Sequence, residues 1–361
     1  MRAEIKSAII MGMVIAGAIG GLSAYFTSLE APSNADTQVL SMDKSKFKKA
    51  PELQGIAGYI NTNADEFKNQ IKGKVVLYDI WTYSCINCQR TIPYIVSWND
   101  KYSDKGLVII GIHSPEFEFE KDINNVKQAT EKFGITYPVI LDNDKQIWNA
   151  FSNNYWPRKY IADDEGYIRY DHIGEGEYAE TEKIIQDLLN ERASRLGLKM
   201  DTVHPLVEIQ ESENGARTPE LYFGYDFAHG RDRLGNSEGF SPNNDVKYVI
   251  PGELQNDHFY LDGVWKNISD RMSLVSDSGI IKLPYFAKEV NIVASGESDL
   301  TILLDGKPIS EENTGEDVKD GKAHTLESRL YNLVKVKESG RHTLEIQINE
   351  PGFEIYTFTF G

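Results

Sequence analysis

Between residues 51 and 196, short apolar runs alternate with amphipathic stretches. The runs are too short for buried helices and are bounded by glycine and charged residues, so they predict buried strands. Strands are expected at 75–80, 107–112 and 139–141, and a hairpin is expected from 159–162, the turn 163–166 and 167–173. Helices are expected over 85–102, 123–133 and 178–196, the last of them with Gly197 as its C-cap. Strands interleaved with helices indicate an α/β layer fold.

From about residue 197 the helical periodicity ends, and residues 198–218 are expected to form a linker. Turn residues separate the strand candidates that follow, at 246–250, 258–261, 272–275, 279–283, 289–294, 300–304, 331–336, 342–348 and 353–360. This spacing is typical of a β-sandwich or jelly roll. We therefore expect a second, all-β domain over 219–361.

The N-terminal segment 8–26 carries no charge, and Arg2 and Lys6 precede it. A helix of about 20 apolar residues can span a bilayer. The flanking cations favour a cytoplasmic N-terminus, with the rest of the chain outside. We expect a membrane anchor at 1–26 and a polar tether at 27–50. A cleaved signal peptide, cut near Ser23 and Ala24, is the alternative, and both interpretations export the protein.

Composition narrows the classes of partner. The chain has 361 residues, of which 40% are hydrophobic and 11% aromatic, so it can bury sizeable cores. Its net charge of -17 argues against nucleic acid or anionic membrane surfaces as main partners, because both require basic patches. The acidic surface is more simply interpreted as solubilising.

Cys85 and Cys88 are the only cysteines, and they lie where a strand turns into a helix. A single C-x-x-C pair indicates redox chemistry or half of a zinc site. The seven histidines have no spacing that would supply the remaining zinc ligands, so redox chemistry is favoured. At a helix start this spacing places both sulfurs on one face. Cys85 is expected at the exposed N-terminus, where backbone N–H groups attract negative charge, and Cys88 one turn inside.

Two residues near the pair suit the chemistry of a dithiol. Asp79 ends the preceding strand, and a buried carboxylate there would have a raised pKa and could accept the proton of Cys88. Trp81 can shield the pair from water. The alternatives are a solvated acid at a strand end for Asp79 and an ordinary core position for Trp81.

Further positions are expected to shape the site. Pro93 would kink the active-site helix. A cis bond between Trp156 and Pro157 would place backbone groups beside Cys85 to hold a substrate segment as an added strand, although a trans turn and a core tryptophan are the alternatives. Asn87, between the cysteines, is expected at the same groove.

These motifs resemble known families. The string 79–88, with Pro93 and Pro157 at their intervals, resembles a thioredoxin fold. Within it, 81–88, 113–117 and 155–157 resemble the thioredoxin-like part of the DipZ family of membrane-linked thiol–disulfide proteins, and 106–142 is similar to the insertion of extracytoplasmic thioredoxins. The match covers roughly residues 50–196. More weakly, 218–220, 224–225, the Trp265 region and 304–307 resemble the carbohydrate-binding-like β-sandwich that follows in that family.

The resemblance implies a membrane-anchored, extracytoplasmic thiol–disulfide oxidoreductase with no cofactor other than the Cys85–Cys88 disulfide. Cys85 would attack a substrate disulfide and Cys88 would resolve the mixed disulfide. Protein thiols and disulfides would be its substrates. DipZ proteins typically carry a multi-helix electron-transfer domain, whereas this chain has one expected span, so a CcdA-like membrane protein would supply electrons. No histidine lies between the cysteines, unlike in strongly oxidising relatives, which favours a reductase. Arg158 departs from the small or hydroxyl residue usual after the proline, which predicts a different groove.

Several interpretations stay open. The chain could instead be a surface protein that binds glycans or proteins through the β-sandwich, with the thioredoxin part as a redox-regulated scaffold. Five aromatic residues could stack on sugars or could be core: Tyr222, Phe223, Tyr225, Tyr260 and Trp265. An oxygen-rich set could hold calcium or could be a solvated loop: Asp226, Asp232, Asn236, Glu238 and Asp245. His113 and Glu116 could be a loop cap and a surface acid, or Glu116 could tune the cysteine environment or contact partner proteins.

Overall fold

The computed structural model describes residues 44–199, 207, 209, 215–228 and 230–361. Residues 45–361 form one compact unit. The expected membrane span at 8–26 and most of the expected tether lie outside the described residues. Within the part of the chain that is described, none of the helices is long and apolar enough to cross a membrane.

The first folded part is built on a six-stranded sheet, counted over the described residues, with the order β1-β4-β3-β2-β5-β6. Its strands are β1 (Gly58–Ile60), β2 (Val75–Trp81), β3 (Leu107–His113), β4 (Val139–Leu141), β5 (Arg158–Ala162) and β6 (Ile168–Ile173). β2, β3 and β4 pair in parallel, and β1, β5 and β6 join the sheet antiparallel. The helices are α2 (Ala64–Gln70), α3 (Ile86–Tyr102), α4 (Ile123–Lys132), α5 (Gln146–Ala150) and α6 (Tyr178–Arg195).

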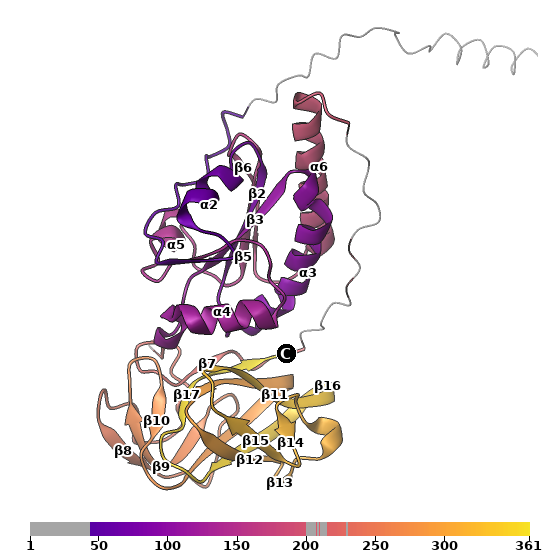
Figure 1. Ribbon diagram of the computed structural model, residues 1–361. Helices are drawn as coiled ribbons and strands as arrows, with labels where there is room; N and C mark the ends of the chain where they lie inside the picture. The colour runs from indigo at the N-terminus through magenta and orange to yellow at the C-terminus, as the bar shows by residue number, and fades with distance from the viewer. Residues whose placement is uncertain (1–43, 200–206, 208, 210–214, 229) are drawn as a thin grey trace, which may run out of the picture. The chain divides into compact units, whose positions relative to one another are not determined.

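Helices cover both faces of this sheet, which explains why its strands read as continuous apolar runs. Alternate side chains of β2 enter the hydrophobic cluster shared with α3 and α6: Val75, Leu77 and Trp81. The others enter the cluster shared with α2 and α5: Val76, Tyr78 and Ile80. Figure 1 shows the two pairs of helices on opposite sides of the sheet. Because side chains alternate along a strand, Asp79 projects on the same face as Trp81, towards α3.

The predicted α/β elements are present with small shifts at their ends. The long elements agree closely, for example β2 at Val75–Trp81 against the expected 75–80 and α6 at Tyr178–Arg195 against 178–196. Gly197 follows α6 with a φ of 67°, a left-handed conformation that suits its expected role at the helix end. The short elements β1, α2 and α5 were not predicted, because they are too brief to establish a period.

The C-terminal part is β-rich. Over the described residues its strands form an eleven-stranded sheet in the order β14-β15-β12-β16-β11-β17-β10-β9-β8, with β13 on β12 and β7 on β17. The longest strands are β9 (Tyr260–Asn267), β11 (Gly279–Ser295), β12 (Ser298–Leu304), β16 (Arg329–Ile348) and β17 (Glu354–Phe360). The shorter ones are β7 (Leu221–Tyr222), β8 (Asp245–Tyr248), β10 (Met272–Leu274), β13 (Lys307–Pro308), β14 (Val318–Lys319) and β15 (Lys322–Thr325).

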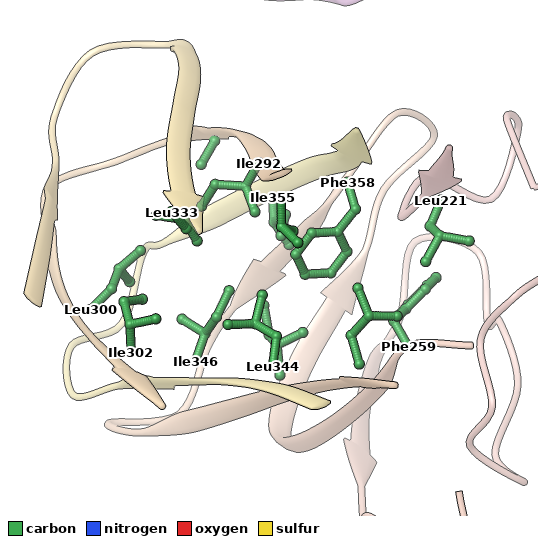
Figure 2. Packing of buried hydrophobic residues seen from close by; sticks show 14 of the residues in the cluster. Leu221, Phe259, Ile292, Leu300, Ile302, Leu333, Leu344, Ile346, Ile355 and Phe358 are labelled. Carbon is green, nitrogen blue, oxygen red and sulfur yellow. The ribbon is translucent and has the colours of Figure 1, made fainter. Parts of the chain in front are cut away.

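An apolar core lies between strands of this part. Figure 2 shows one row of side chains facing a second row: Leu300, Ile302, Leu344 and Ile346 against Ile292, Leu333, Ile355 and Phe358. β16 contributes to both rows because it is long and irregular. Its pairing with β11 shifts register between Ala287 and Glu289, which lie opposite Gly340 and Lys335. Such bulges let one strand turn a corner and line two layers.

Two expectations about strands in this part are therefore wrong. The pairs 279–283 with 289–294, and 331–336 with 342–348, were expected as four strands, but each pair is one strand, β11 and β16. Pro284 and Gly340 made the breaks look like turns. In the structure both residues are paired within the β11–β16 ladder: Pro284 lies opposite Thr343, and Gly340 lies opposite Ala287. The bulge between Ala287 and Glu289 accommodates the residues that do not pair.

Parts of the expected tether and linker contact the first folded part. At the end of the tether, Ala50 N–H donates to Gly166 O at 2.9 Å and Ile168 N–H donates to Lys48 O at 2.8 Å. In the linker, Val207 N–H donates to a Glu182 carboxylate oxygen at 2.6 Å, and the Tyr94 hydroxyl donates to Ile209 O at 3.0 Å. These segments are thus attached to the fold at specific points.

Candidate active site

Cys85 is the N-cap residue of α3, as the sequence predicted. Its Sγ accepts a hydrogen bond from the Cys88 N–H at 3.3 Å, and its φ and ψ of -78° and 119° are extended. Both cysteines are free thiols; Cys85 is half-buried and Cys88 is buried. An N-capping sulfur lies where unpaired helix N–H groups favour negative charge. The geometry therefore presents one sulfur outward with the other behind it.

Cys88 lies inside the cluster of apolar residues between the sheet and α3. Burial raises the pKa of the Cys88 thiol well above its usual value, and the neighbouring Cys85 sulfur adds to this shift. A thiol in this environment keeps its proton until a base removes it. Any attack by Cys88 therefore requires a proton acceptor inside the protein.

Asp79 is placed to be that acceptor. Its side chain is 1% exposed, and Oδ1 has no hydrogen-bond partner among the described residues. Burial raises the pKa of Asp79 to about 7, an effect that Lys159 partly opposes. The charge of Asp79 in turn contributes to the raised pKa of Cys88. The solvated alternative for Asp79 is wrong, because this carboxylate has almost no contact with solvent.

Lys159 is a charged partner that sequence reasoning missed. It lies opposite Asp79 in the antiparallel β2–β5 pair, so the two side chains share a face of the sheet. Lys159 is fully buried, and its Nζ donates to Gly174 O at 3.0 Å. Burial lowers the pKa of Lys159 to about 8, while the charges of Asp79, Cys88 and Glu175 oppose the shift. Lys159 gave little signal in the sequence, because it follows Arg158 at the start of the strand, where charged residues are common.

Glu120 was not predicted as a site residue. It connects the cysteine loop to the segment after β3. It is fully buried. One carboxylate oxygen accepts from the Ser84 hydroxyl at 2.6 Å, and the other accepts from the N–H groups of Glu116 at 2.6 Å and Phe117 at 3.0 Å. This carboxylate therefore positions the residue before Cys85 and the backbone of Glu116 together.

The peptide bond between Trp156 and Pro157 is cis, as predicted. Trp156 Nε1 donates to Ser114 O at 2.9 Å, and its ring lies 4.2 Å from that of Trp148. Trp156 and Asn87 line the same cavity as Cys85. Pro93 lies on the exposed side of α3, which continues through it, and the kink expected there stays a prediction.

Trp81 and His113 lie side by side beneath the cysteine loop. Both are fully buried, and their rings meet edge-on with centroids 5.3 Å apart. Burial lowers the pKa of His113 to about 3, so the ring is neutral at neutral pH. Its Nε2 lies 3.3 Å from the Thr82 hydroxyl, and its ring stacks on Tyr83. His113 is therefore a core residue and not the loop cap that was considered.

A cavity of about 500 Å³ opens in front of Cys85, and residues from both folded parts of the chain line it. From the first part come Ser84, Cys85, Ile86, Asn87, Glu116 and Trp156, and from the C-terminal part come Thr218, Glu220, Tyr222, Arg231, Thr357 and Thr359. Its volume is in the range of small-ligand pockets. The cavity is thus completed by a part of the chain that no local motif around the cysteines could indicate.

Direct contacts hold the C-terminal part at this position. The Tyr222 hydroxyl donates to a Glu116 carboxylate oxygen at 2.9 Å, and the Tyr83 hydroxyl donates to Ser328 O at 2.9 Å. Arg90 pairs with Glu289 at 3.3 Å. An apolar cluster adds side chains from both parts, namely Phe117, Tyr222, Val293, Leu330 and Tyr356. Glu116 is therefore not a free surface acid.

The aromatic residues considered for sugar stacking are mostly core. Tyr222, Phe223, Tyr260 and Trp265 are buried, and Tyr225 is half-buried. The oxygen-rich loop forms internal bonds. Asn236 bonds the backbone of Val249 and Leu261, and Asp232 accepts from the Leu234 N–H. Among the residues described, three acidic, histidine or cysteine side chains nowhere gather as a metal site would require.

Comparison with known proteins gives two family matches. Residues 48–189 match a family described as Redoxin, and residues 218–361 match one described as Thioredoxin like C-terminal domain. The chain is 35% identical over 314 residues to Protein DipZ of Mycobacterium bovis, which covers 86% of this chain and 43% of that protein. The chain thus spans less than half the length of that curated relative. The similarity confirms the resemblance seen in the motifs.

A second relative matches the first folded part alone. The thiol-disulfide oxidoreductase YkuV of Bacillus subtilis is 30% identical over 142 residues, which covers 39% of this chain and 94% of YkuV. Among solved structures, the solution structure of a thioredoxin-like protein in the oxidised form is 29% identical. The match covers 40% of this chain and 97% of the chain in that solved structure, with a TM-score of 0.37. The Redoxin match and the similarity to YkuV give the first part a thioredoxin-like α/β fold, which a β-rich C-terminal part follows.

Proposed function

This chain belongs to the family of thioredoxin-like thiol–disulfide oxidoreductases, and we propose that it reduces disulfides in protein substrates. One observation carries the proposal. Cys85 caps α3 at the edge of a cavity, and Cys88 lies buried behind it with its N–H bonded to the Cys85 sulfur. A half-exposed nucleophilic sulfur with a protected second sulfur one turn away is the arrangement that disulfide exchange requires.

The proposed reaction has two steps. The Cys85 thiolate attacks a substrate disulfide, the substrate S–S bond breaks, and one substrate sulfur leaves as a thiolate and takes up a proton. Asp79 then accepts the proton of Cys88, whose thiolate attacks the Cys85 sulfur of the mixed disulfide. The second substrate thiolate leaves, and a Cys85–Cys88 disulfide remains. Asp79 suits this role because its pKa of about 7 lets it accept and return a proton near neutral pH.

The remaining site residues shape the substrate groove in this proposal. The cis peptide bond at Pro157 presents its flanking backbone to a substrate segment beside Cys85. Trp81 keeps water from the sulfurs, and Trp156 and Asn87 form walls of the cavity. Pro93 shapes the helix that carries both cysteines.

The proposal extends to the organisation of the chain. Residues 1–26 anchor it in a membrane and 27–50 form a tether. Residues 51–196 and 219–361, joined by 198–218, lie on the extracytoplasmic side. A CcdA-like membrane protein reduces the Cys85–Cys88 disulfide after each turnover. The C-terminal part, as a jelly-roll-like sandwich, binds a partner protein, a glycan or the cell surface. Its mostly buried aromatic residues favour a protein partner over a stacked sugar.

A turnover assay tests the activity. The purified full chain is expected to reduce insulin or glutathione disulfide, and Cys85→Ser is expected to abolish the reaction because no attacking thiolate remains. Circular dichroism of both proteins shows whether the variant is folded. Equal rates for the wild type and Cys85→Ser would refute the enzyme and favour a redox-regulated scaffold.

The direction of exchange is tested by the reduction potential of the Cys85–Cys88 pair. We expect a value near that of thioredoxin, about -270 mV, because a reductase must hold its disulfide in a stable oxidised form. The measurement is equilibration against glutathione buffers with the thiols trapped by alkylation. A value near about -120 mV would identify an oxidase instead.

A further inference from the structure

Two carboxyl groups share one phenol in the cavity beside Cys85. The Tyr222 hydroxyl lies 2.9 Å from a Glu116 carboxylate oxygen and 3.0 Å from a Glu220 carboxylate oxygen. Glu116 follows β3, and the other two residues belong to the C-terminal part. All three line the cavity together with Cys85. The cluster therefore forms only where the two folded parts of the chain meet.

The hydrogen-bond count favours an additional proton in the cluster. A phenol has one O–H to donate, whereas an ionised carboxylate can only accept. With two carboxyl groups in contact, Tyr222 can donate to one of them. Both contacts are full hydrogen bonds, each with a proton of its own, only if one carboxyl group is protonated and donates to the phenol oxygen. The geometry is therefore satisfied by one carboxylic acid and one carboxylate.

The charges around Glu116 favour its protonated form. Loss of solvent contact raises the pKa of Glu116 to about 8, and the carboxylates of Glu220 and Glu120 add to the shift. Burial raises the pKa of Glu220 as well. The Tyr222 hydroxyl and the Lys145 ammonium act in the opposite direction. The Arg231 guanidinium, 5.5 Å from the centre of the Tyr222 ring, faces the cluster from the cavity rim.

One polar side chain in the cavity wall lacks a hydrogen-bond partner. Thr359 is 3% exposed and lines the cavity, and its hydroxyl has no hydrogen-bond partner among the described residues. A buried hydroxyl without a partner costs free energy unless a bound molecule supplies one. The cavity wall thus contains a buried hydroxyl that has no partner among the described residues.

Asp79 cannot serve the substrate's leaving sulfur, because it is 1% exposed and lies on the sheet face that α3 covers. The leaving thiolate forms on the cavity side of Cys85, and Glu116 lines the same cavity. This reasoning rests on the proposed function, since it concerns the first step of disulfide exchange. The site would then contain two acid–base groups, one for each sulfur that changes its protonation.

We propose that Glu116, held by Tyr222, is the acid that protonates the thiolate leaving the substrate. In this step the Cys85 thiolate forms an S–S bond to one substrate sulfur while the substrate S–S bond breaks. The electron pair goes to the departing sulfur, which takes the proton of the Glu116 carboxyl group. The resulting carboxylate accepts the Tyr222 hydrogen bond, and the solvent-exposed Glu220 provides the route for a replacement proton.

Two neutral disulfides with different leaving groups test the proposal. The leaving thiol of 2,2′-dithiodipyridine is stable as an anion and needs no acid, whereas that of bis(2-hydroxyethyl) disulfide is basic. In a full-length Cys88→Ser background, mixed-disulfide formation with each is followed by quenched mass spectrometry. Glu116→Gln is expected to slow the alkyl reaction about 100-fold, the lower end of general acid catalysis, and to leave the aryl reaction within about twofold. Tyr222→Phe should show the same selectivity with a smaller loss.

The pH dependence of the alkyl-to-aryl rate ratio provides a second measurement, in which titration of the nucleophile cancels. The acid form of Glu116 is lost as pH rises, so the ratio is expected to fall through pH about 8 and to be flat in Glu116→Gln. Glu118→Gln is the matched control, because Glu118 is an exposed carboxylate of the same segment and pairs with Lys121. It should change neither rate.

Each other outcome has a defined meaning. If Glu116→Gln slows mixed-disulfide formation with both disulfides equally, or slows neither reaction, the proposal is overturned. If that variant does not fold, a flat ratio between about pH 6 and pH 10 in the parent protein overturns it alone. A parent protein that reacts with neither disulfide refutes the proposed function itself, and the role of Glu116 with it.

Discussion

The two folded parts of the chain differ in the kind of polar group that they bury. Among the described residues, the first part buries Asp79, His113, Glu120 and Lys159 with almost no solvent contact, around or beneath the two cysteines. Most of the polar side chains buried in the C-terminal part are amides and hydroxyls, such as Asn267. Burying a titratable group costs free energy unless it is fully paired. The first part bears this cost around its cysteines, and the second part buries mainly neutral polar groups.

The difference indicates a division of roles. Perturbed titratable groups gather where proton transfer is needed, and here they surround the sulfurs. The C-terminal part contributes rigid walls and a few polar groups at the cavity, such as Tyr222 and Thr359. The following predictions test whether chemistry and stability are separated in this way.

The largest expected effect is a loss of stability with rising pH caused by Asp79. The folded protein holds the Asp79 proton up to pH about 7, whereas the unfolded chain releases it near the ordinary value of 3.8. The folded state therefore binds more protons in this window, and the unfolding free energy falls as pH rises, by roughly 4 kcal/mol at most. Urea unfolding between these pH values should show the decrease, and Asp79→Asn should lessen it. The exposed Asp65→Asn is the control, and an equal slope in wild type and Asp79→Asn would contradict the prediction.

The second prediction concerns the apolar core of the C-terminal part. Ile346→Ala removes methyl groups from a fully buried side chain and should lower the unfolding free energy by about 3 kcal/mol. The rate of mixed-disulfide formation by the folded variant should stay within about twofold of the wild type, because Ile346 does not line the cavity. Urea unfolding measures the unfolding free energy, and the quenched reaction with 2,2′-dithiodipyridine measures the rate of mixed-disulfide formation. A large loss of rate in the folded protein would show that the two roles are not separate.

The third prediction concerns the rate of the second chemical step. Asp79→Asn removes the proton acceptor of Cys88 and should slow resolution of the mixed disulfide about 100-fold at neutral pH, the lower end of acid–base catalysis. Attack by Cys85 should change much less, because Asp79 lies behind Cys88. The resolution step is measured alone by starting from the preformed mixed disulfide, quenching the reaction at intervals and analysing the products. The attack by Cys85 is measured in a separate reaction that starts from the free thiols. Equal slowing of both steps would assign Asp79 a structural role instead.

Much of the first part could be predicted because its signals are local. β2 and α6 were placed within one residue at each end by apolar runs and helical periodicity. The cysteine spacing and the strand-to-helix transition located Cys85 at a helix start, and Asp79 and Pro157 followed from their positions in the same pattern. The C-terminal strands were less predictable, because Pro284 and Gly340 resemble turn signals while a bulge keeps β11 and β16 continuous.

By itself the sequence determined where the two cysteines lie and which local elements present them, since helix capping, strand alternation and cysteine spacing act over a few neighbouring residues. The tertiary structure alone decided that Lys159 faces Asp79 and that Glu120 holds the cysteine loop. It alone brought Tyr222 and Glu220 to Glu116, more than 100 residues away in the chain. Such pairs depend on strand register and on the packing of distant segments. Burial then sets their proton affinities, and a linear pattern records neither the packing nor the burial.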